Sequence, residues 1–96
     1  MMKYEDITDY VAKLVGEGDE LIASVHQKSM ELSKYGVYPV DPTRGRLLEL
    51  LVRLQSPTRV LEIGSGAGYS ALWLMRGMGS KGTLDAIERS PEVVKV

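Results

Sequence analysis

The chain has 96 residues, which is enough for one small domain. Its formal net charge is −1, so it lacks the basic field that holds nucleic acid, and none of its apolar runs approaches the ~20 residues that a membrane span needs. The absence of cysteine excludes a disulfide framework and a thiolate metal site, and a cytoplasmic location is expected.

The first third of the chain predicts two amphipathic helices. Residues 4–15 place five apolar side chains at helical spacing, and the glycines at 16 and 18 end that helix. Asp19 is a suitable N-cap for a second helix, which ends near Gly36. His26, the only histidine, has no second metal-type ligand three or four residues later. We interpret it as a surface or partly packed residue and not as a catalytic base.

An extended segment leads to a third predicted helix. Pro39 and Pro42 disfavour helical conformation in the residues before them. Asp41 followed by Pro42 is a typical helix start, with an N-cap side chain and then proline at the first helical position. The helix runs to about Gln55 and carries a wide apolar stripe, formed by Leu47, Leu48, Leu51, Val52 and Leu54.

The remaining segments predict a strand–helix–strand unit. Residues 60–63 form a short apolar strand, and a glycine turn leads into a helix over residues 69–78, in which Trp73 is a core residue. A second strand covers residues 83–88 and ends in Glu88. The Ser-Pro-Glu sequence at 90–92 begins another helix.

The glycine turn and the acidic strand end suit a nucleotide-like cofactor. Small residues let the backbone approach the ligand, helix N–H groups face a negative group, and a carboxylate at a strand end can bind a ribose diol. A dinucleotide fingerprint would have glycine at its sixth position, where Tyr69 stands, so a nicotinamide cofactor is disfavoured. A tight strand-to-helix turn without any ligand is the alternative.

The pattern Glu62-x-Gly64-x-Gly66-x-Gly68 resembles motif I of the class I S-adenosylmethionine-dependent methyltransferases. Its continuation into Tyr-Ser, and the upstream segment Val-Asp-Pro-Thr-Arg-Gly-Arg-Leu-Leu at 40–48, resemble the catechol and caffeoyl-CoA type O-methyltransferases. The resemblance implies an α/β chain that is the N-terminal part of a Rossmann-like methyltransferase fold. Residues 1–96 would be one incomplete methyltransferase domain, with N-terminal helices over 1–37 and the start of the cofactor-binding core over 38–96.

The same resemblance implies roles for individual residues. Glu62 would contact the methionine amino group, Ser70 the methionine carboxylate, and Glu88 both ribose hydroxyls. The backbone near the cofactor and the cover over its sulfonium end would come from Gly64, Ser65, Tyr69, Tyr38 and Val40. Structural alternatives are a carboxylate bonded to turn amides for Glu62, a helix N-cap for Ser70, and a solvated turn residue for Glu88. Arg89 would stack on adenine or lie at the surface.

The resemblance also implies what this chain does not contain. In the family the divalent metal ligands, the lysine base and most of the substrate pocket follow the third strand, so a Mg²⁺-type metal is expected only through residues absent from this chain. The function implied is metal-assisted methyl transfer to a hydroxyl of a small catechol-like substrate. The alternatives are a methyltransferase of the same family for a hydroxylated tRNA base, or a non-catalytic folding or interaction unit.

Two parallel strands alone would each leave one edge without a hydrogen-bonded neighbour. A parallel sheet is also normally covered by helices on both faces. We therefore expect the chain to be the N-terminal part of a larger domain. On its own it should be marginally stable, or form a homo-oligomer through the open sheet edge.

Overall fold

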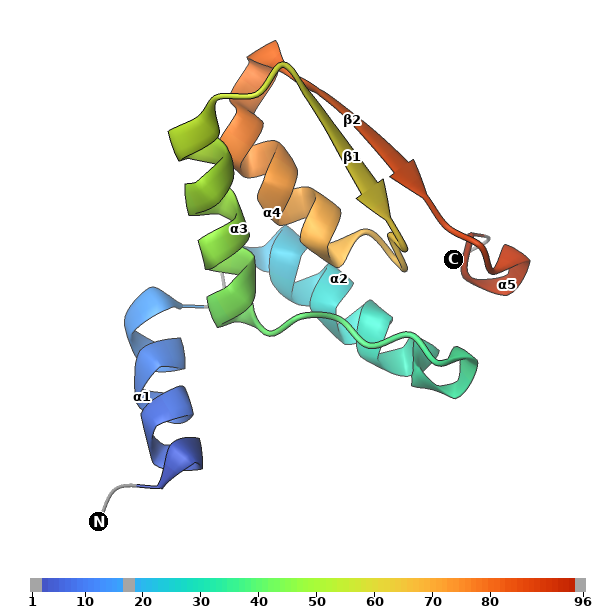
Figure 1. Cartoon of the computed structure of the whole chain (residues 1–96). Helices are drawn as coiled ribbons and strands as arrows, with labels where there is room; N and C mark the ends of the chain where they lie inside the picture. Colours follow the sequence, from blue (N-terminus) through green and yellow to red (C-terminus); the bar gives the residue numbers. More distant parts are fainter. Residues whose placement is uncertain (1–2, 17–18, 95–96) are drawn as a thin grey trace.

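The structure, a computed structural model, describes residues 3–16 and 19–94 (Figure 1). Its elements follow the expected order. They are α1 (Tyr4–Val15), α2 (Glu20–Glu31), the 3₁₀ helix η1 (Leu32–Tyr35), α3 (Pro42–Gln55), β1 (Arg59–Ile63), α4 (Tyr69–Met78), the 3₁₀ helix η2 (Gly79–Lys81), β2 (Thr83–Ile87) and α5 (Pro91–Val94). The glycine break between the first two helices lies partly outside the described residues.

The helix starts follow the capping signals in the sequence. The Asp19 carboxylate accepts a hydrogen bond from the Ile22 amide at 3.0 Å and begins α2. The Asp41 carboxylate accepts one from the Arg44 amide at 2.8 Å and begins α3. These two caps satisfy amides that a helix start leaves without intrahelical acceptors.

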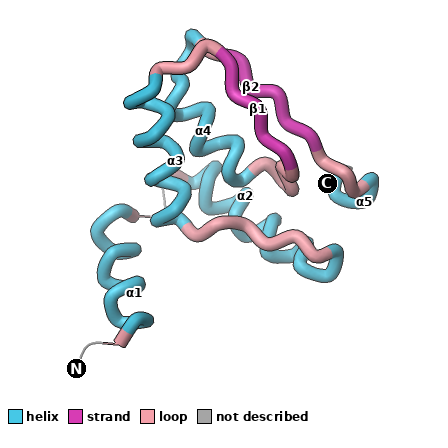
Figure 2. Tube along the Cα trace, in the orientation of Figure 1, coloured by secondary structure: helices cyan, strands magenta, loops and turns pink. Residues whose placement is uncertain are grey.

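The strands β1 and β2 pair in parallel, and α4 is the crossover between them (Figure 2). Val60 pairs with Leu84 and Ile63 with Ile87. Helices α3 and α4 lie on one side of this sheet, and α2 packs against the first half of α4 (Figure 1). The predicted α/β class with a parallel sheet and flanking helices is confirmed.

The core is built around α4. Trp73 and Ile22 are fully buried and Tyr69 nearly so, and partly buried apolar side chains of α2, α3 and α4 pack against them. Gly45 of α3 lies flat on the Trp73 ring: a Cβ atom there would lie 2.2 Å from the indole Nε1. The absence of a side chain at this position therefore allows α3 and α4 to approach closely.

The apolar stripe expected on α3 is mostly a surface feature. Val52 is buried and Leu48 packs against the core, but Leu47 and Leu51 are about half exposed and Leu54 is 75% exposed. The helix instead turns Gly45, Glu49 and Val52 toward α4, because these residues follow one another at intervals of four and three along one face. Glu49 can be buried there because its carboxylate is paired with two arginines of the same helix, Arg46 and Arg53.

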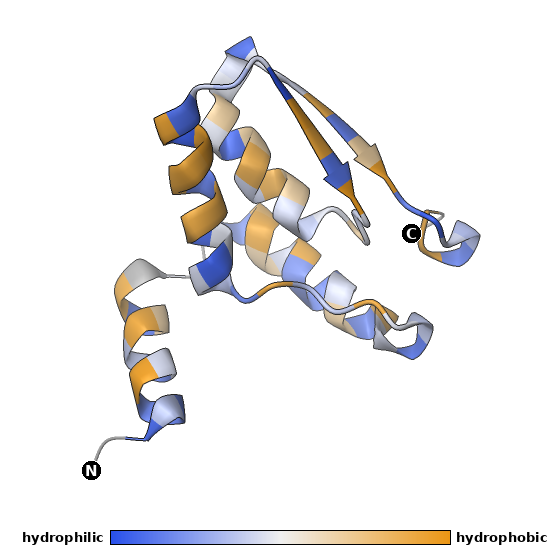
Figure 3. Ribbon diagram, viewed as in Figure 1, coloured by the Kyte–Doolittle hydropathy of each residue, from blue (hydrophilic) through white to orange (hydrophobic). Residues whose placement is uncertain are grey.

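One face of the sheet carries exposed apolar side chains. We call Leu61, Ile63 and Ile87 the bare sheet face; their side chains lie on the side of the strands away from α4 and are 60%, 78% and 54% exposed. Figure 3 shows the apolar bands of both strands and of α1 and α3. Among the described residues, no helix is long and apolar enough to cross a membrane.

Candidate functional site

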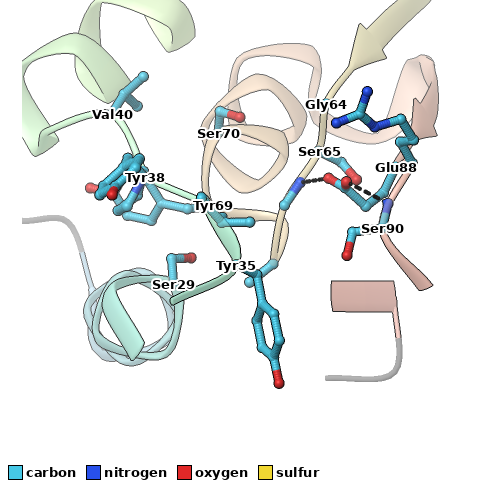
Figure 4. A pocket seen from close by; sticks show the side chains of 16 residues that line it. Ser29, Tyr35, Tyr38, Val40, Gly64, Ser65, Tyr69, Ser70, Glu88 and Ser90 are labelled. Atoms are coloured by element: carbon cyan, nitrogen blue, oxygen red, sulfur yellow. Dashed lines mark hydrogen bonds between the residues drawn. The ribbon is translucent and has the colours of Figure 1, made fainter. Parts of the chain in front are cut away.

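A pocket of about 370 Å³ lies at the carboxyl ends of both strands (Figure 4). Parallel strands point their carboxyl ends at the same edge, and this edge is where α/β folds bind ligands. The segment from Tyr35 to Val40, the glycine loop after β1, the start of α4 and the residues after β2 line the pocket.

The glycine loop is held in a conformation that other residues rarely adopt. Gly64, Gly66 and Gly68 all have positive φ, at 84°, 56° and 93°. The Ile87 carbonyl at the end of β2 accepts hydrogen bonds from the Gly64 and Ser65 amides at 2.7 and 3.1 Å. These bonds fix the loop against the second strand, where it lines the pocket.

Glu88 braces the same loop from the other side. One carboxylate oxygen accepts a hydrogen bond from the Gly66 amide at 2.7 Å, and the other accepts one from the Ser90 amide at 3.0 Å. The Ser90 amide, followed by that of Gly66, lowers the pKa of the Glu88 carboxyl below its ordinary value of 4.5. Each oxygen keeps a second lone pair, so this bracing is compatible with acceptance of bonds from a ribose diol.

Glu62 and Ser70 form a second polar pair at the base of α4. The Ser70 hydroxyl donates to Glu62 Oε2 at 2.6 Å, whereas Glu62 Oε1 is buried with no hydrogen-bond partner among the described residues. A buried carboxylate oxygen without a partner is unfavourable, so it suits a donor that arrives with a ligand. The structural alternatives foreseen for this pair do not occur here: Glu62 bonds to a side chain, and the N-cap position of α4 is Gly68.

The other expected residues lie around the pocket as well. Tyr38, Val40, Ser65, Tyr69 and Arg89 all line it together with Gly64, Ser70 and Glu88. Glu62 is the exception among the expected residues, because it lies behind Ser70 and does not line the pocket.

Tyr69 is a rigid wall of the site. Its ring is 2% exposed and lies 4.8 Å from the His26 ring and 6.4 Å, edge to face, from Trp73. The partly packed position predicted for His26 is confirmed. Tyr38, in contrast, is 75% exposed at the pocket rim.

Several lining residues were not predicted as site residues, among them the hydroxyl-bearing Ser29, Tyr35 and Ser90. Ser29 follows Ile22 and Val25 at helical spacing and shares their apolar face of α2. Its hydroxyl was the available signal, because a polar side chain on an otherwise apolar face needs a partner. Within the part of the chain that the structure describes, acidic and histidine residues do not gather into a group of three that could hold a metal ion.

Comparisons with known proteins point to one family. Residues 15–96 match the sequence model of the family described as protein-L-isoaspartate(D-aspartate) O-methyltransferase (PCMT). A Mycobacterium leprae protein that bears the provisional name O-methyltransferase is 40% identical over 78 residues, which cover 81% of this chain and 34% of that protein. The chain thus spans about a third of the length of the curated relatives it matches.

Solved structures agree with this result. The O-methyltransferase TomG of Streptomyces achromogenes, which is involved in tomaymycin synthesis and was solved with S-adenosylmethionine, superposes with a TM-score of 0.81 at 33% identity. The match covers 99% of this chain and 44% of TomG. An O-methyltransferase from Bacillus cereus, solved with S-adenosylhomocysteine, gives 0.80 at 32% identity over 93% of this chain and 40% of that protein.

Proposed function

The chain belongs to the family described by the PCMT model, within the class I S-adenosylmethionine-dependent O-methyltransferases, and on this premise we propose that it forms the first half of a methyl-donor site. One observation carries the proposal. The glycine loop, Ser70 and Glu88 line one pocket at the strand ends, and Ser70 links that pocket to the Glu62 carboxylate behind it. Residues 38–96 would be the start of the cofactor-binding core and residues 1–37 its N-terminal helices.

The pocket residues fit S-adenosylmethionine by charge and shape. The unpartnered Glu62 Oε1 can accept from the methionine ammonium, directly or through a water. The charged Glu88 carboxylate can accept from the two ribose hydroxyls, and the loop glycines, whose positive φ angles disfavour other residues, add no side chains to the pocket. Tyr38 and Val40 would cover the sulfonium end.

Bound S-adenosylmethionine supplies a methyl group on a positively charged sulfur, which a substrate oxygen takes in a single displacement. The residues of this chain would orient the donor for that step, since positioning is a large part of what such a reaction needs. The proposed acceptor is a hydroxyl of a small catechol-like molecule, with a divalent metal held by residues outside this chain. The isoaspartyl carboxylate named in the family description is the competing acceptor.

The cofactor class is tested by thermal unfolding in the presence of S-adenosylhomocysteine or NAD. We expect S-adenosylhomocysteine to raise the unfolding temperature and NAD to leave it unchanged. Stabilisation by NAD alone would contradict the proposal.

The acceptor is tested by transfer of a labelled methyl group, with Mg²⁺, to catechol, an isoaspartyl peptide or tRNA. We expect the 96-residue chain to bind the donor without turnover. A longer protein containing this sequence should methylate catechol. Methylation of only the peptide or the tRNA by that protein would assign the acceptor to another class.

We also propose a cytoplasmic protein that self-associates through the open sheet edge. Only two strands pair within the described residues, so each has one edge without a strand partner there, and an open edge can pair with a second copy. Sedimentation velocity at increasing concentration should show reversible dimers. A monomer at every concentration would contradict this proposal.

A further inference from the structure

Ser29 of α2 is a buried hydroxyl without a use in the fold. The residue is 1% exposed, and its Oγ has no hydrogen-bond partner among the described residues. It lines the same pocket as Val40, Tyr69 and Ser70. Figure 4 shows its side chain projecting from α2 on the side where Tyr69 and Tyr38 lie. A buried hydroxyl that donates to nothing is unfavourable in the free protein, so a ligand in the pocket is its natural partner.

The hydrogen bonds of the pocket leave the methionine carboxylate of a bound cofactor without a serine donor from α4. The family resemblance implied that the Ser70 hydroxyl holds the methionine carboxylate. A hydroxyl has a single proton, and here Ser70 donates it to Glu62 Oε2 at 2.6 Å. Ser70 therefore offers the carboxylate only lone pairs, which two anionic oxygens do not need. The first-turn amides of α4 can donate, but no other serine hydroxyl from the start of α4 is available.

We propose that Ser29 donates its hydroxyl proton to the methionine carboxylate of the bound cofactor. This inference rests on the function proposed above and names the residue that completes its cofactor site. Ser70 then orients Glu62 toward the ammonium, while Ser29 and the amides at the start of α4 bind the carboxylate from opposite walls. The ammonium and the carboxylate of the methionine part therefore depend on different serines: Ser70 acts through Glu62, and Ser29 acts directly.

The geometry also explains why the donor comes from α2. Tyr69, between α2 and the glycine loop, is fixed by His26 and Trp73, so the distance between the two walls is set by rigid packing. The Asp19 cap, which accepts from the Ile22 amide, holds the start of the same helix. A hydroxyl on a fixed helix loses little rotational freedom when it binds.

The test is a calorimetric titration of two ligands into two variants of the full chain. The ligands are S-adenosylmethionine and decarboxylated S-adenosylmethionine, which differ only in the carboxylate. The variants are Ser29→Ala and the matched control Ser24→Ala. Ser24 lies on the same helix but is exposed, and its hydroxyl donates to the Leu21 carbonyl of that helix. Glu88→Ala is included as an independent check on the cofactor site.

We expect Ser29→Ala to weaken S-adenosylmethionine binding by about tenfold, because a hydrogen bond to a charged group is lost. The affinity of Ser29→Ala for decarboxylated S-adenosylmethionine should equal that of the unsubstituted chain. Ser24→Ala should bind both ligands as the unsubstituted chain does. Without ligand, Ser29→Ala should unfold at the same temperature as the unsubstituted chain or higher, since it removes an unsatisfied hydroxyl.

Two outcomes would overturn the assignment of Ser29. Equal weakening of both ligands would mean that Ser29 acts through packing, and unchanged binding of both would mean that it does not reach the ligand. If Glu88→Ala weakens binding in either case, the proposed function stands and only this inference fails. If the unsubstituted chain binds neither ligand, the proposed function fails and the inference fails with it.

Discussion

The two faces of the β1–β2 sheet differ in how far their side chains are buried. The face toward α4 is closed by a helical layer in which Trp73 and Ile22 are fully buried, whereas the bare sheet face exposes Leu61, Ile63 and Ile87 to solvent. The candidate site lies at the strand ends and is lined by α2, residues 35–40, the glycine loop, the start of α4 and the residues after β2. The proposed cofactor pocket therefore depends on the packed side of the sheet, and no residue of the bare sheet face lines it.

The largest effect should follow from removal of the central side chain on the packed side. Trp73→Ala should destabilise the chain by about 3–5 kcal/mol, because a fully buried indole leaves a cavity that its neighbours cannot fill. Urea denaturation followed by circular dichroism measures this loss. Retention of a cooperative transition at the original midpoint would mean that α3 and α4 do not pack around Trp73.

A smaller loss, confined to ligand binding, should follow from removal of the Glu88 carboxylate at the end of β2. Glu88→Ala should markedly weaken S-adenosylmethionine binding, because the charged carboxylate that would accept hydrogen bonds from the ribose hydroxyls is removed. The variant also frees the Gly66 amide, so the loop should exchange its amide hydrogens faster while the helices stay protected. Unchanged affinity would reduce Glu88 to a surface turn residue.

Truncation of a side chain on the bare sheet face should cost much less stability than truncation on the packed face. Leu61→Ala should change the free energy of unfolding by no more than about 0.5 kcal/mol in the monomeric chain, since the side chain is already 60% exposed. The same urea titration at low protein concentration measures it, with Trp73→Ala as the opposite extreme. A loss approaching that of Trp73→Ala would show that this face is covered in solution.

The smallest effect on cofactor affinity should come from a fall in pH. The two backbone amides lower the pKa of Glu88, so its contribution to loop order is complete above the ordinary value of 4.5 and disappears only as pH falls through the lowered value. Cofactor affinity should therefore be constant from neutral pH to about 5, close to the ordinary range of a glutamate, and decline below it. Glu88→Gln should remove this decline. An equal decline in that variant would assign it to another carboxylate, such as Asp19, whose pKa is lowered by the Ile22 amide and Arg76.

The sequence was most informative where local chemistry decides the structure. The Asp19 and Asp41 caps, the positive-φ glycines and the burial of Trp73 were predictable, because each follows from contacts or sterics within a few residues or from one strong pattern. The α3 stripe is only partly buried, through Leu48 and Val52, because helix periodicity identifies an apolar face but not the face that the neighbouring helix contacts. There, Gly45 decided the outcome by allowing Trp73 to approach.

Within the site, types of residue were predictable but not their partners. The sequence pointed to Glu62, Ser70 and Glu88 as a set, yet gave no sign that Ser70 would donate to Glu62 or that Glu88 would accept from Gly66. The first bond depends on how α4 packs against β1, and the second, between residues 22 apart, depends on the register of β1 against β2. Ser29 escaped notice for the same reason, since its role arises only when α2 is placed against α4.

The most direct test of the central claim is a calorimetric titration of S-adenosylmethionine into the 96-residue chain beside its Glu88→Ala variant. The account predicts saturable binding by the chain and a marked loss of affinity in the variant, because the packed side of the sheet already assembles the loop and its carboxylate brace. Absence of binding by a folded chain, or equal binding by both proteins, would contradict the claim that this pocket is a methyl-donor site.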